Sequence, residues 1–567
     1  MIRFSLRAGL GILGFTVTCV PLQANDLFVA PGGTPFGPGT LAQPYDVVTA
    51  FSGDVGQPGD TFWLRGGDYQ LGHLDTQIQG APGKPITYRQ VSGEHARIDG
   101  SLTLFDSLGY VVFRDFELYS SDTNRVSAQT NAGFNVTDIT LLSGFSSYTP
   151  NLSFINLVVH DATREGIYLF EGSTNTLIYG CIVYNNGWVS PDNAEGHGLY
   201  VQGDVGMRTV ADNIVFNNSG ASLHVYENSN GGSLYGVTLD GNVAFNAGAI
   251  QQVRAYRDWI VGVDSPALYA DRIVLGSNMG FVARGATTYP QLQLGRDGTN
   301  GNVILTNNYM QLGLLMNNWR TATVSGNLFA PRWTNYVVNL NQTLTALNAE
   351  WDNNIYIFDP PGPAVSLDFG AYTFSDWQQM TGFDLDSTFV VGDLHGTKVF
   401  VRPNLYQAGR ANIIVYNWDN LSNVVVDVSS VLPMNSGFEV RNAEDFEAAP
   451  VLSGVFTGQR LQLPMTNLTV AVPNVPTNGP LAAAPPTGPT FNVFVLLPLR
   501  GQLQISRSGG SIQVYWPVGA GPGALQTAPS LTGNWTDSPN TPVMVEDQFM
   551  MGDPLSSTQK FYRLRPH

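Results

Sequence analysis

The chain has 567 residues, 43% of them hydrophobic, and a formal net charge of −17 at pH 7. This length is too great for one ordinary hydrophobic core, so we expect several domains or a long repeat array. The negative charge argues against nucleic acid and anionic membranes as partners, and it suits a polyanionic substrate only where basic residues gather locally.

The first 24 residues have the pattern of a secretion signal. A positively charged start is followed by an apolar run over residues 8–20 and by the sequence PLQA, which predicts cleavage after Ala24. The apolar run is too short for a stable spanning helix, so we expect a secreted or cell-surface protein with no membrane insertion after signal removal. Lipid attachment at Cys19 is disfavoured because a threonine precedes it. Cleavage would leave Cys181 alone, so no internal disulfide is expected.

Residues 25–100 predict an N-terminal cap followed by the first strands of a repeat. The cap has a strand, a turn rich in Gly and Pro, and a short helix at about Tyr45–Phe51. The stretches GDTFWLRGGDYQL and KPITYRQVSGEHARIDG then follow as apolar strands closed by Gly, and YVVFRDFELYSS continues the series.

From about 150 to 358 a short unit recurs in which an asparagine precedes an apolar strand. Asparagine accepts left-handed backbone and can bond neighbouring main chain, so a stacked series predicts a structural ladder at one turn. Its members are Asn213, Asn242, Asn278, Asn308, Asn327 and Asn354, with Cys181 in the equivalent place one repeat earlier.

Three near-copies of one strand lie within residues 165–226: EGIYLF, GHGLYVQ and ASLHVY. Aligning Ile167, Leu199 and Leu223 places these residues on one apolar face by strict alternation. The opposite, outward row carries Tyr168, Tyr200 and His224, with Phe170, Gln202 and Tyr226 beside it. Such repetition is the signature of a solenoid of stacked strands.

The order of the cap and strands resembles secreted right-handed parallel β-helix proteins of the pectate-lyase-like superfamily, and NNGW…GHGLYVQG is the most specific part of the likeness. The resemblance implies an all-β fold with a β-helix and its cap over residues 25–384. Stacking of strands at about 4.8 Å gives about ten to twelve rungs in a rod roughly 50 Å long. Its right-handedness is implied by the family and by the general crossover rule.

The remainder of the chain predicts further β-structure. Residues 371–386 form a short amphipathic helix and turn, and residues 385–473 alternate as a compact β-sandwich that we expect at the C-terminal end of the β-helix. Residues 474–490 are rich in Pro, Ala and Gly, which predicts a linker. Residues 491–567 resemble the Ig-like C-terminal modules of large bacterial exoproteins, which implies a role in surface display or sorting.

A candidate site lies where an insertion, residues 185–195, leaves the predicted ladder. Its mixture of rings, carboxylates and histidines suits carbohydrate, because rings stack on sugar faces and polar groups bond hydroxyls. The candidate catalytic residues are His197, Glu195, Asp192, His224 and Tyr200. The candidate substrate-binding residues are Trp188, Arg164, Glu165, Tyr168, Gln202, Tyr226, Arg254 and Arg296.

Structural roles compete with these functional ones. His197 stands between two glycines, so its ring could cap a turn by bonding backbone. Tyr168 and Tyr200 could simply stack between rungs.

The residue types limit the chemistry. Elimination on a uronate needs a base and a cation to neutralise the carboxylate. Lysine, the base of several lyases in this superfamily, is absent between residues 85 and 397, so Arg, or a His and Tyr pair, would have to serve. Hydrolysis needs paired carboxylates, which Glu195 could form with Asp192 or Glu165. The other motifs of the polygalacturonase-type hydrolases that share GHG are absent.

We therefore expect a polysaccharide-processing protein, as a lyase or a glycoside hydrolase. The alternative is a non-catalytic glycan-binding or structural β-helix protein of the cell surface. We expect a monomer. No compact aspartate loop predicts a metal, and calcium held by scattered carboxylates stays open as a cofactor.

Overall fold

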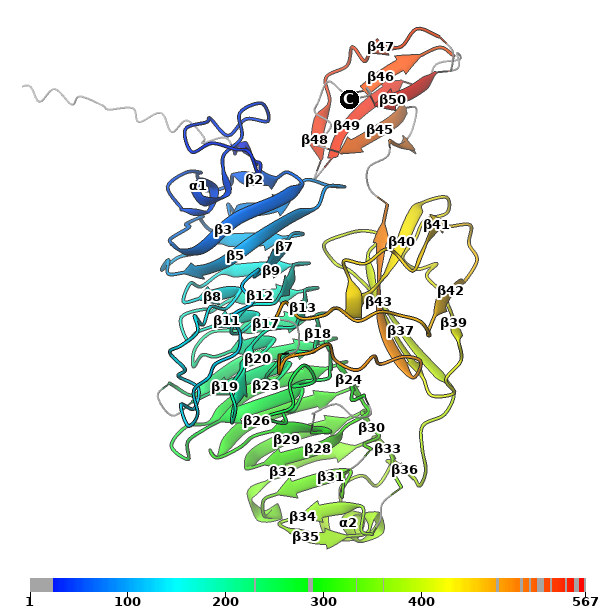
Figure 1. The fold of residues 1–567 in the computed structure, drawn as a ribbon. Helices are drawn as coiled ribbons and strands as arrows, with labels where there is room; N and C mark the ends of the chain where they lie inside the picture. The colour runs from blue at the N-terminus through cyan, green and yellow to red at the C-terminus, as the bar shows by residue number, and fades with distance from the viewer. Residues whose placement is uncertain are drawn as a thin grey trace, which may run out of the picture.

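A computed structural model describes residues 24–567 except 229–230, 284–288, 333, 360–361, 476–478, 500–502, 509–510, 518–524, 531–532, 546–547, 555–559 and 565–567. The predicted secretion signal lies almost wholly outside these residues. Figure 1 shows a tall column of stacked strands, with a second β-unit along one side and a third beside its N-terminal end. Within the described part of the chain, no helix combines the length and apolar character needed to cross a bilayer.

The column is a parallel β-helix with three faces, and the predicted fold class is confirmed. Sheet 1 has twelve strands among the described residues, within the expected number of rungs. In order these are β1 (Asp26–Val29), β2 (Thr61–Leu64), β4 (Ile86–Gln90), β6 (Val111–Arg114), β9 (Leu152–Ile155), β12 (Thr176–Tyr179), β17 (Arg208–Ala211), β20 (Leu234–Asp240), β23 (Ala270–Gly276), β26 (Asn300–Thr306), β29 (Trp319–Ser325) and β32 (Asn348–Asp352).

Two further stacks complete the helix. They diverge from the long strand β5 (Ala96–Leu104), which pairs with β3 (Gly67–Thr76). Sheet 2 runs through β7 (Glu117–Tyr119), β10 (Val158–His160), β13 (Ile182–Tyr184), β18 (Ile214–Phe216), β21 (Val243–Phe245), β24 (Met279–Phe281), β27 (Tyr309–Met310), β30 (Leu328–Phe329), β33 (Ile355–Ile357) and β36 (Thr388–Val390).

Sheet 3 carries the predicted outward row. It runs through β8 (Phe145–Ser147), β11 (Ile167–Leu169), β16 (Leu199–Val201), β19 (Leu223–Glu227), β22 (Trp259–Val263), β25 (Gln291–Leu294), β28 (Gly313–Asn317), β31 (Val338–Asn341) and β34 (Val365–Leu367), and ends at the antiparallel β35 (Gly370–Tyr372).

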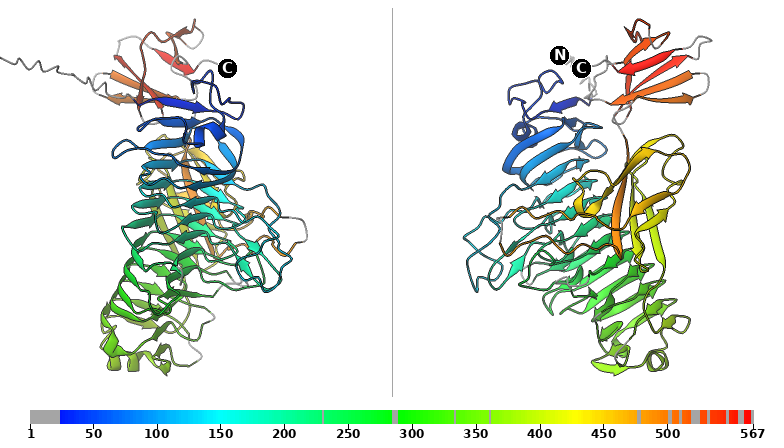
Figure 2. Two further views of the ribbon diagram at one scale, coloured as in Figure 1. Left: turned by 90° about the vertical axis from the view of Figure 1, so that its left-hand side faces the viewer. Right: turned by 45° about the vertical axis from the view of Figure 1, so that its right-hand side comes forward.

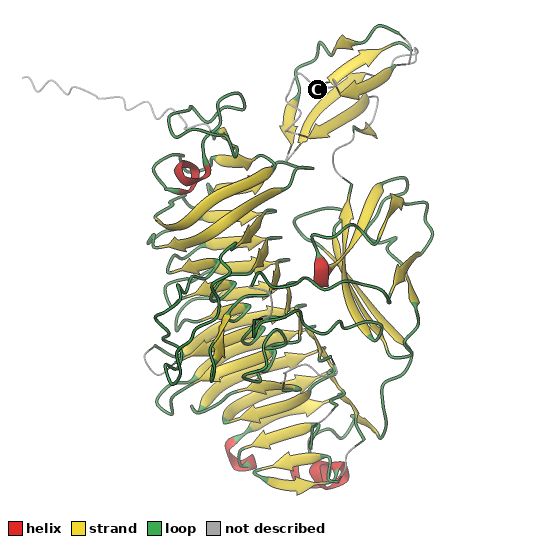
Figure 3. Ribbon diagram, viewed as in Figure 1, coloured by secondary structure: helices red, strands yellow, loops and turns green. Residues whose placement is uncertain are grey.

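Both ends of the column are covered by short helices (Figure 3). At the N-terminal end α1 (Val47–Phe51) begins at the N-cap Asp46 and stacks Phe51 on Tyr88 at 4.5 Å between ring centroids. At the other end α2 (Phe374–Thr381) buries Trp377 completely, and the indole of Trp377 donates to Asp384 at 2.9 Å. These caps lie where the sequence predicts helices. They cover the first and last rungs, whose unpaired strand edges could otherwise pair with other chains. The 3-10 turn η1 (Leu344–Ala346) precedes β32.

The asparagine ladder is confirmed. The side-chain oxygen of each member accepts from the backbone and side-chain nitrogens of the previous one, at 3.1 and 2.9 Å between Asn213 and Asn242. The same pattern continues through Asn278, Asn308, Asn327 and Asn354, and Asn213 accepts from the backbone nitrogen of Cys181 at 2.9 Å.

The left-handed backbone belongs to the residue before each ladder asparagine. Asp212, Ser277, Asn307 and Asn353 have φ between 53 and 59°, and glycines precede the remaining members. The ladder side chains are therefore buried hydrogen-bonding groups at the turn, and the tolerance of asparagine for positive φ is not what selects them.

A β-sandwich packs along the side of the column. Its larger sheet has the order β37 (Thr397–Pro403), β38 (Ala411–Asn417), β43 (Phe491–Pro498), β40 (Gly437–Asn442) and β41 (Leu452–Val455), and β39 (Asn423–Val426) pairs with β42 (Leu461–Pro464). The 3-10 turn η2 (Ala443–Asp445) follows β40. Ile414, Tyr416 and Phe491 pack on outward apolar residues of sheet 2, from Val158 in β10 to Phe281 in β24. The sandwich therefore lies against the middle rungs, and its expected place at the C-terminal end of the β-helix is wrong.

The structure corrects the predicted boundary between the sandwich and the tail. Strand β43 falls after the predicted linker, yet it pairs with β38 on one side and β40 on the other. The predicted linker itself is packed. Leu481 and Ala484 lie in one apolar cluster with Val189 and Ile250 of the β-helix, and the Asn474 backbone donates to Asp161 at 2.8 Å. Residues 474–475 and 479–490 thus belong to a strap that crosses the β-helix and returns to the sandwich (Figure 2).

The last unit begins after β43. It comprises one sheet of β44 (Gln504–Ser508), β45 (Ser511–Pro517), β49 (Gln548–Pro554) and β48 (Val543–Val545), and a second of β47 (Thr536–Asp537), β46 (Leu525–Ala528) and β50 (Phe561–Leu564). Met544 and Phe549 pack on Trp63 and Val91 near the N-terminal end of the β-helix. Its predicted likeness to Ig-like modules stays a prediction.

Replacing Asn242 and Asn278 together by Ala should lower the midpoint of thermal unfolding. Each removes buried hydrogen bonds worth on the order of 1 kcal/mol apiece and leaves backbone groups without partners. The exposed Asn348 provides the control, and Asn348→Ala should leave the midpoint unchanged. Equal midpoints for the double variant and the control would show that the asparagine ladder does not contribute to the stability of the fold.

Truncation after Pro473 should unfold the sandwich, because it removes the strand between β38 and β40. Truncation after Leu499 retains that strand and should leave the sandwich folded. Limited proteolysis of the two shortened chains separates these outcomes, and a protease-resistant sandwich in the shorter one would contradict the observed strand order.

Candidate functional site

The predicted outward row is present, and the pairing register of the parallel strands in sheet 3 determines which residues form it. Tyr168 pairs with Tyr200, Tyr200 with His224, and His224 with Ile260 on successive strands of sheet 3. The rings of Tyr168 and Tyr200 stack with centroids 4.5 Å apart, and those of Tyr200 and His224 lie 4.7 Å apart. The row forms a continuous aromatic floor.

The tyrosines of this floor are mostly buried, and the Tyr168 hydroxyl is hydrogen-bonded. Tyr168 is 5% exposed and Tyr200 9%. The Tyr168 hydroxyl donates to Gln202 at 3.0 Å, and the Gln202 amide donates to Glu227 at 3.2 Å. Stacking between rungs therefore accounts for the position of both tyrosines, and Gln202 links the Tyr168 hydroxyl to Glu227.

A hairpin formed by the insertion overhangs this floor. Strand β14 (Trp188–Val189) pairs antiparallel with β15 (Ala194–Glu195), so that Trp188 faces Glu195. The buried Arg125 holds the base of the hairpin by donating to Gly187 at 2.8 Å and by pairing with Asp161 at 2.7 Å. A Cβ at Gly196, whose φ is +113°, would lie 2.0 Å from the Gly187 Cα, so the neck of the hairpin requires glycine.

His197 is held by the turn, as the structural alternative foresees. It is 3% exposed, and its Nδ1 accepts from the Ala221 backbone nitrogen at 2.8 Å. This bond places the proton of the neutral ring on Nε2, which lies 3.4 Å from Glu195. Burial and the nearby Arg254 and Arg164 lower the pKa of His197 to about 3. His197 is thus a neutral ring whose Nε2 lies beside the Glu195 carboxyl.

Glu195 is the titratable group of the site. Burial raises the pKa of this carboxyl from its ordinary value of 4.5 to about 7, against the lowering influence of Arg254 and the Tyr256 hydroxyl. Tyr256 lies 3.0 Å from the carboxyl and also donates to the Ala194 carbonyl at 2.6 Å. A carboxyl with a pKa near neutrality can both give and take a proton at physiological pH.

His224 presents a second neutral group. Burial lowers its pKa well below the ordinary value of 6.5, and His197, Arg296 and Arg254 add to the effect. Its Nδ1 has no hydrogen-bond partner among the described residues. The rings of His197 and His224 lie 4.0 Å apart, so His197 stands between Glu195 and His224.

Four arginines surround the floor. Arg254 donates to Asn193 at 2.9 Å and Arg296 to the Tyr226 hydroxyl at 2.6 Å. Arg257 donates to Gln291 at 3.2 Å, and Arg164 pairs with Glu165 at 3.2 Å. The cavity walls thus hold these four arginines and three carboxyl groups, those of Glu165, Glu195 and Asp264, a formal excess of one positive charge in an acidic protein. Arg254 and Arg296 are exposed, and Arg296 lies 3.4 Å from Asp264.

These groups line one cavity of about 870 Å³. It brings together eleven of the thirteen predicted site residues, which is the convergence that the register predicts. They are Arg164, Glu165, Tyr168, Trp188, Glu195, His197, Tyr200, His224, Tyr226, Arg254 and Arg296.

Two predicted residues lie outside the cavity. Asp192 is exposed at the hairpin tip, where its carboxylate accepts from the Asn131 backbone at 2.7 Å and from Ser190 at 3.1 Å. The structure therefore places the Asp192 carboxylate in a surface turn, away from the other candidate catalytic residues. Gln202 accepts from the Tyr168 hydroxyl and is not among the residues that line the cavity.

Trp188 lines the cavity but is only 1% exposed, because it packs against Val136 and Ile139. It cannot offer its face to a sugar as a sugar platform must. The sequence did not single out Tyr256, Phe134, Asp264, Tyr289 or Gln293, which also line the cavity. Tyr256 lies in the stretch AIQQVRAYRDW, which the arginines Arg254 and Arg257 mark as a basic loop.

Residues 27–258, less than half of the chain, match the family described as the Pel9A-like, right handed beta helix region. This match spans the cap, the outward row and the hairpin. The matched region is a right-handed β-helix of the pectate-lyase-like superfamily. The handedness expected from the sequence is thereby confirmed.

Solved structures similar to this chain include two lyases and a glucanase. Pectate lyase Pel9A is 15% identical over 61% of this chain and 82% of its own, with a TM-score of 0.35. A mannuronic acid specific family 6 lyase from human gut microbiota is 13% identical over 65% and 86%, with a TM-score of 0.39. A GH87 α-1,3-glucanase from Streptomyces thermodiastaticus strain HF3-3 is 14% identical over 64% and 67%, with a TM-score of 0.34. No curated protein sequence matches the chain.

The raised pKa of Glu195 predicts a pH-dependent stability. Because the folded protein holds this proton more tightly than the unfolded chain, Glu195 should destabilise the fold as the pH rises from about 4.5 through about 7. Glu195→Gln removes the effect, so its free energy of unfolding relative to the wild type should rise over this range, by up to about 3 kcal/mol.

Urea unfolding between pH 4.5 and 8 measures this difference. Asp192→Asn is the matched control, because it alters an exposed carboxylate of the same hairpin. A Glu195→Gln difference that stays constant with pH would mean that this carboxyl titrates normally.

Proposed function

We propose that this chain is a secreted enzyme that cleaves an acidic polysaccharide in the cavity above the outward row. The observation that carries the proposal is the set of groups around one space: four arginines, the neutral His224 and the protonatable Glu195. The proposal of secretion rests on the predicted signal at residues 1–24. Pel9A, which gives the matched family its name, is a pectate lyase.

The arginines favour a substrate that carries carboxylates. Guanidinium groups bind carboxylates in two-pronged geometry, and their attraction is strong in a partly buried site. The whole protein is acidic, so a polyanion would be drawn to this cavity and repelled elsewhere. The exposed Arg254 and Arg296 are the groups that a uronate carboxylate would meet first.

Elimination uses each of these features. The arginines neutralise the uronate carboxylate and so acidify the C5 proton, which passes to the imidazole of His224. The C4–O bond breaks as the C4=C5 double bond forms, and Glu195 gives its proton to the departing oxygen. A bound carboxylate also offsets the arginine charges that lower the pKa of His224, which makes His224 a better base in the complex.

Hydrolysis is a second candidate because Glu165 and Glu195 line the same cavity. Glu165 pairs with Arg164 and accepts from Ser143 at 2.8 Å. Glu195 would then act as the acid and Glu165 as the carboxylate partner. This reaction leaves a new reducing end and forms no double bond.

The test is incubation of the full chain with a panel of uronate-containing and neutral polysaccharides. The ultraviolet absorbance of unsaturated uronate ends reports elimination, and reducing ends without that absorbance report hydrolysis. Elimination should occur on uronate polymers only. Glu195→Gln and His224→Ala should each lower kcat/KM at least about a hundredfold, the scale of losing an acid or base.

Asp192→Asn should keep full activity, since its carboxylate lies outside the cavity. Hydrolysis that survives His224→Ala but not Glu195→Gln or Glu165→Gln would favour the second candidate over elimination. Binding of polysaccharide with no cleavage by the wild type would overturn both and leave the non-catalytic glycan-binding alternative.

A further inference from the structure

A second polar cavity, of about 390 Å³, lies between the β-helix and the sandwich. Its walls include His95, which precedes β5, and Glu117 in β7. The sandwich contributes Glu447, from the loop between β40 and β41. This cavity shares no lining residue with the one above the outward row.

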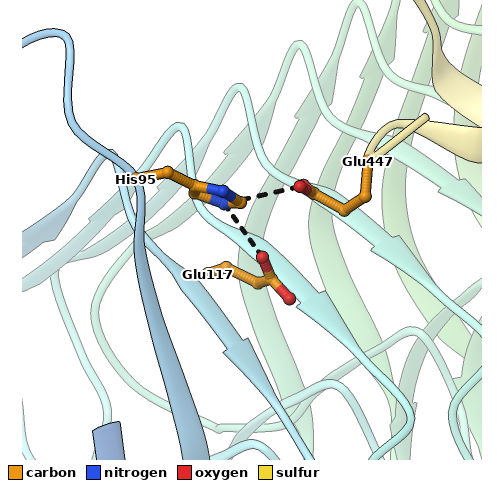
Figure 4. A group of neighbouring side chains, drawn as sticks. All are labelled: His95, Glu117 and Glu447. Carbon is orange, nitrogen blue, oxygen red and sulfur yellow. Dashed lines mark ion pairs between the residues drawn. The ribbon is translucent and has the colours of Figure 1, made fainter. Parts of the chain in front are cut away.

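Three ligand-type groups converge at this interface (Figure 4). His95 Nε2 lies 2.9 Å from a Glu117 oxygen and 3.5 Å from a Glu447 oxygen. All three atoms lie within 4.8 Å of one another. One nitrogen and two carboxylate oxygens thus meet from segments that are far apart in the chain.

This spacing suits a small transition-metal ion. Zinc binds imidazole nitrogen and carboxylate oxygen at about 2.0–2.2 Å in tetrahedral sites, which sets neighbouring ligand atoms roughly 3.4 Å apart. The two measured separations lie on either side of that value. A small adjustment of the half-exposed His95 and Glu447 side chains would complete three corners of a tetrahedron.

Further groups fix the buried ligand. The Glu117 side chain has no exposed surface, and Arg97 Nε lies 3.1 Å from both of its oxygens. His160 Nε2 contacts the other oxygen at 3.1 Å and is itself held by Asp161 at 2.7 Å. Carboxylates that bind metals are oriented in this manner by surrounding hydrogen bonds.

An independent observation shows that the cavity offers unused polar atoms. Ser92 is 8% exposed and Arg410 5%, and both line the cavity. Ser92 Oγ and Arg410 Nε have no hydrogen-bond partner in the part of the chain that the structure describes. Buried polar atoms are rarely left unpaired, so the cavity is built to hold water or a ligand. Such water would supply the remaining coordination positions of a metal.

We propose that His95, Glu117 and Glu447 form a binding site for a divalent transition-metal ion, with zinc as the best-fitting probe, that ties the sandwich to the β-helix. The fourth ligand is water from the cavity. Because Glu447 belongs to the sandwich and the other two ligands to the β-helix, the metal stabilises their contact. This site does not depend on the function proposed for the outward row.

The test uses the full chain without a histidine tag, freed of metal by a chelator and titrated with zinc chloride near pH 7.5 in a calorimeter. We expect one saturable site per chain and a higher midpoint of thermal unfolding with zinc. His95→Gln and Glu447→Gln, which alter exposed residues, should each weaken zinc binding at least about tenfold. Cobalt should give the visible spectrum of a four-coordinate ion.

Glu439→Gln is the matched control, because this carboxylate lines the same cavity but pairs with Arg441 at 2.7 Å instead. It should bind zinc as the wild type does. Absence of saturable binding, or binding that survives both ligand changes, would overturn the proposal and leave the three groups as a salt-bridge cluster. An equal loss in the control would also overturn it.

Discussion

Parallel stacking in register is the constraint on which this structure depends. Each strand repeats the position of the one before it at a spacing of about 4.8 Å, so a side chain at a given position meets the equivalent side chain of the next rung. A residue type can repeat over many rungs only if its side chain interacts favourably with the same type of side chain on the next rung. Asparagines do so through amide bonds at the buried turn, aliphatic residues through packing in the core, and aromatic rings through stacking on the outward row.

The candidate site results from interrupting this regularity. The insertion forms a hairpin that projects from the column. The hairpin places Glu195 above the aromatic floor that the stacked strands of sheet 3 form. Arg125 hydrogen-bonds to the base of the hairpin, and the two arms approach closely at Gly187 and Gly196. Burial then sets the charges: it keeps His197 and His224 neutral and allows Glu195 to keep a proton near pH 7. The packing that holds these side chains in place therefore also shifts their pKa values, because it buries them.

The sequence predicted most of the features that local repetition determines. The alternation around Ile167, Leu199 and Leu223 placed the outward row correctly, and the asparagine repeat predicted the ladder. The sequence could not predict pairing between strands that are far apart in the chain. Strand β43 comes after a stretch that looks like a linker, and only the folded chain shows that its partners lie much earlier in the sequence. Within the hairpin, alternation alone could not tell that Glu195 turns toward the cavity while Asp192 stays at the tip.

The position of β43 also has a consequence for the order of folding. The chain is made from its N-terminus, so the rungs of the β-helix can stack before the last strand of the sandwich exists. Until Phe491–Pro498 emerges, the sandwich has a gap at the centre of its main sheet. The outward apolar residues of sheet 2, such as Ile182, Ile214 and Val243, then have no cover. Newly made protein thus passes through a stage with an open sheet edge beside an apolar surface, where aggregation competes with completion of the fold.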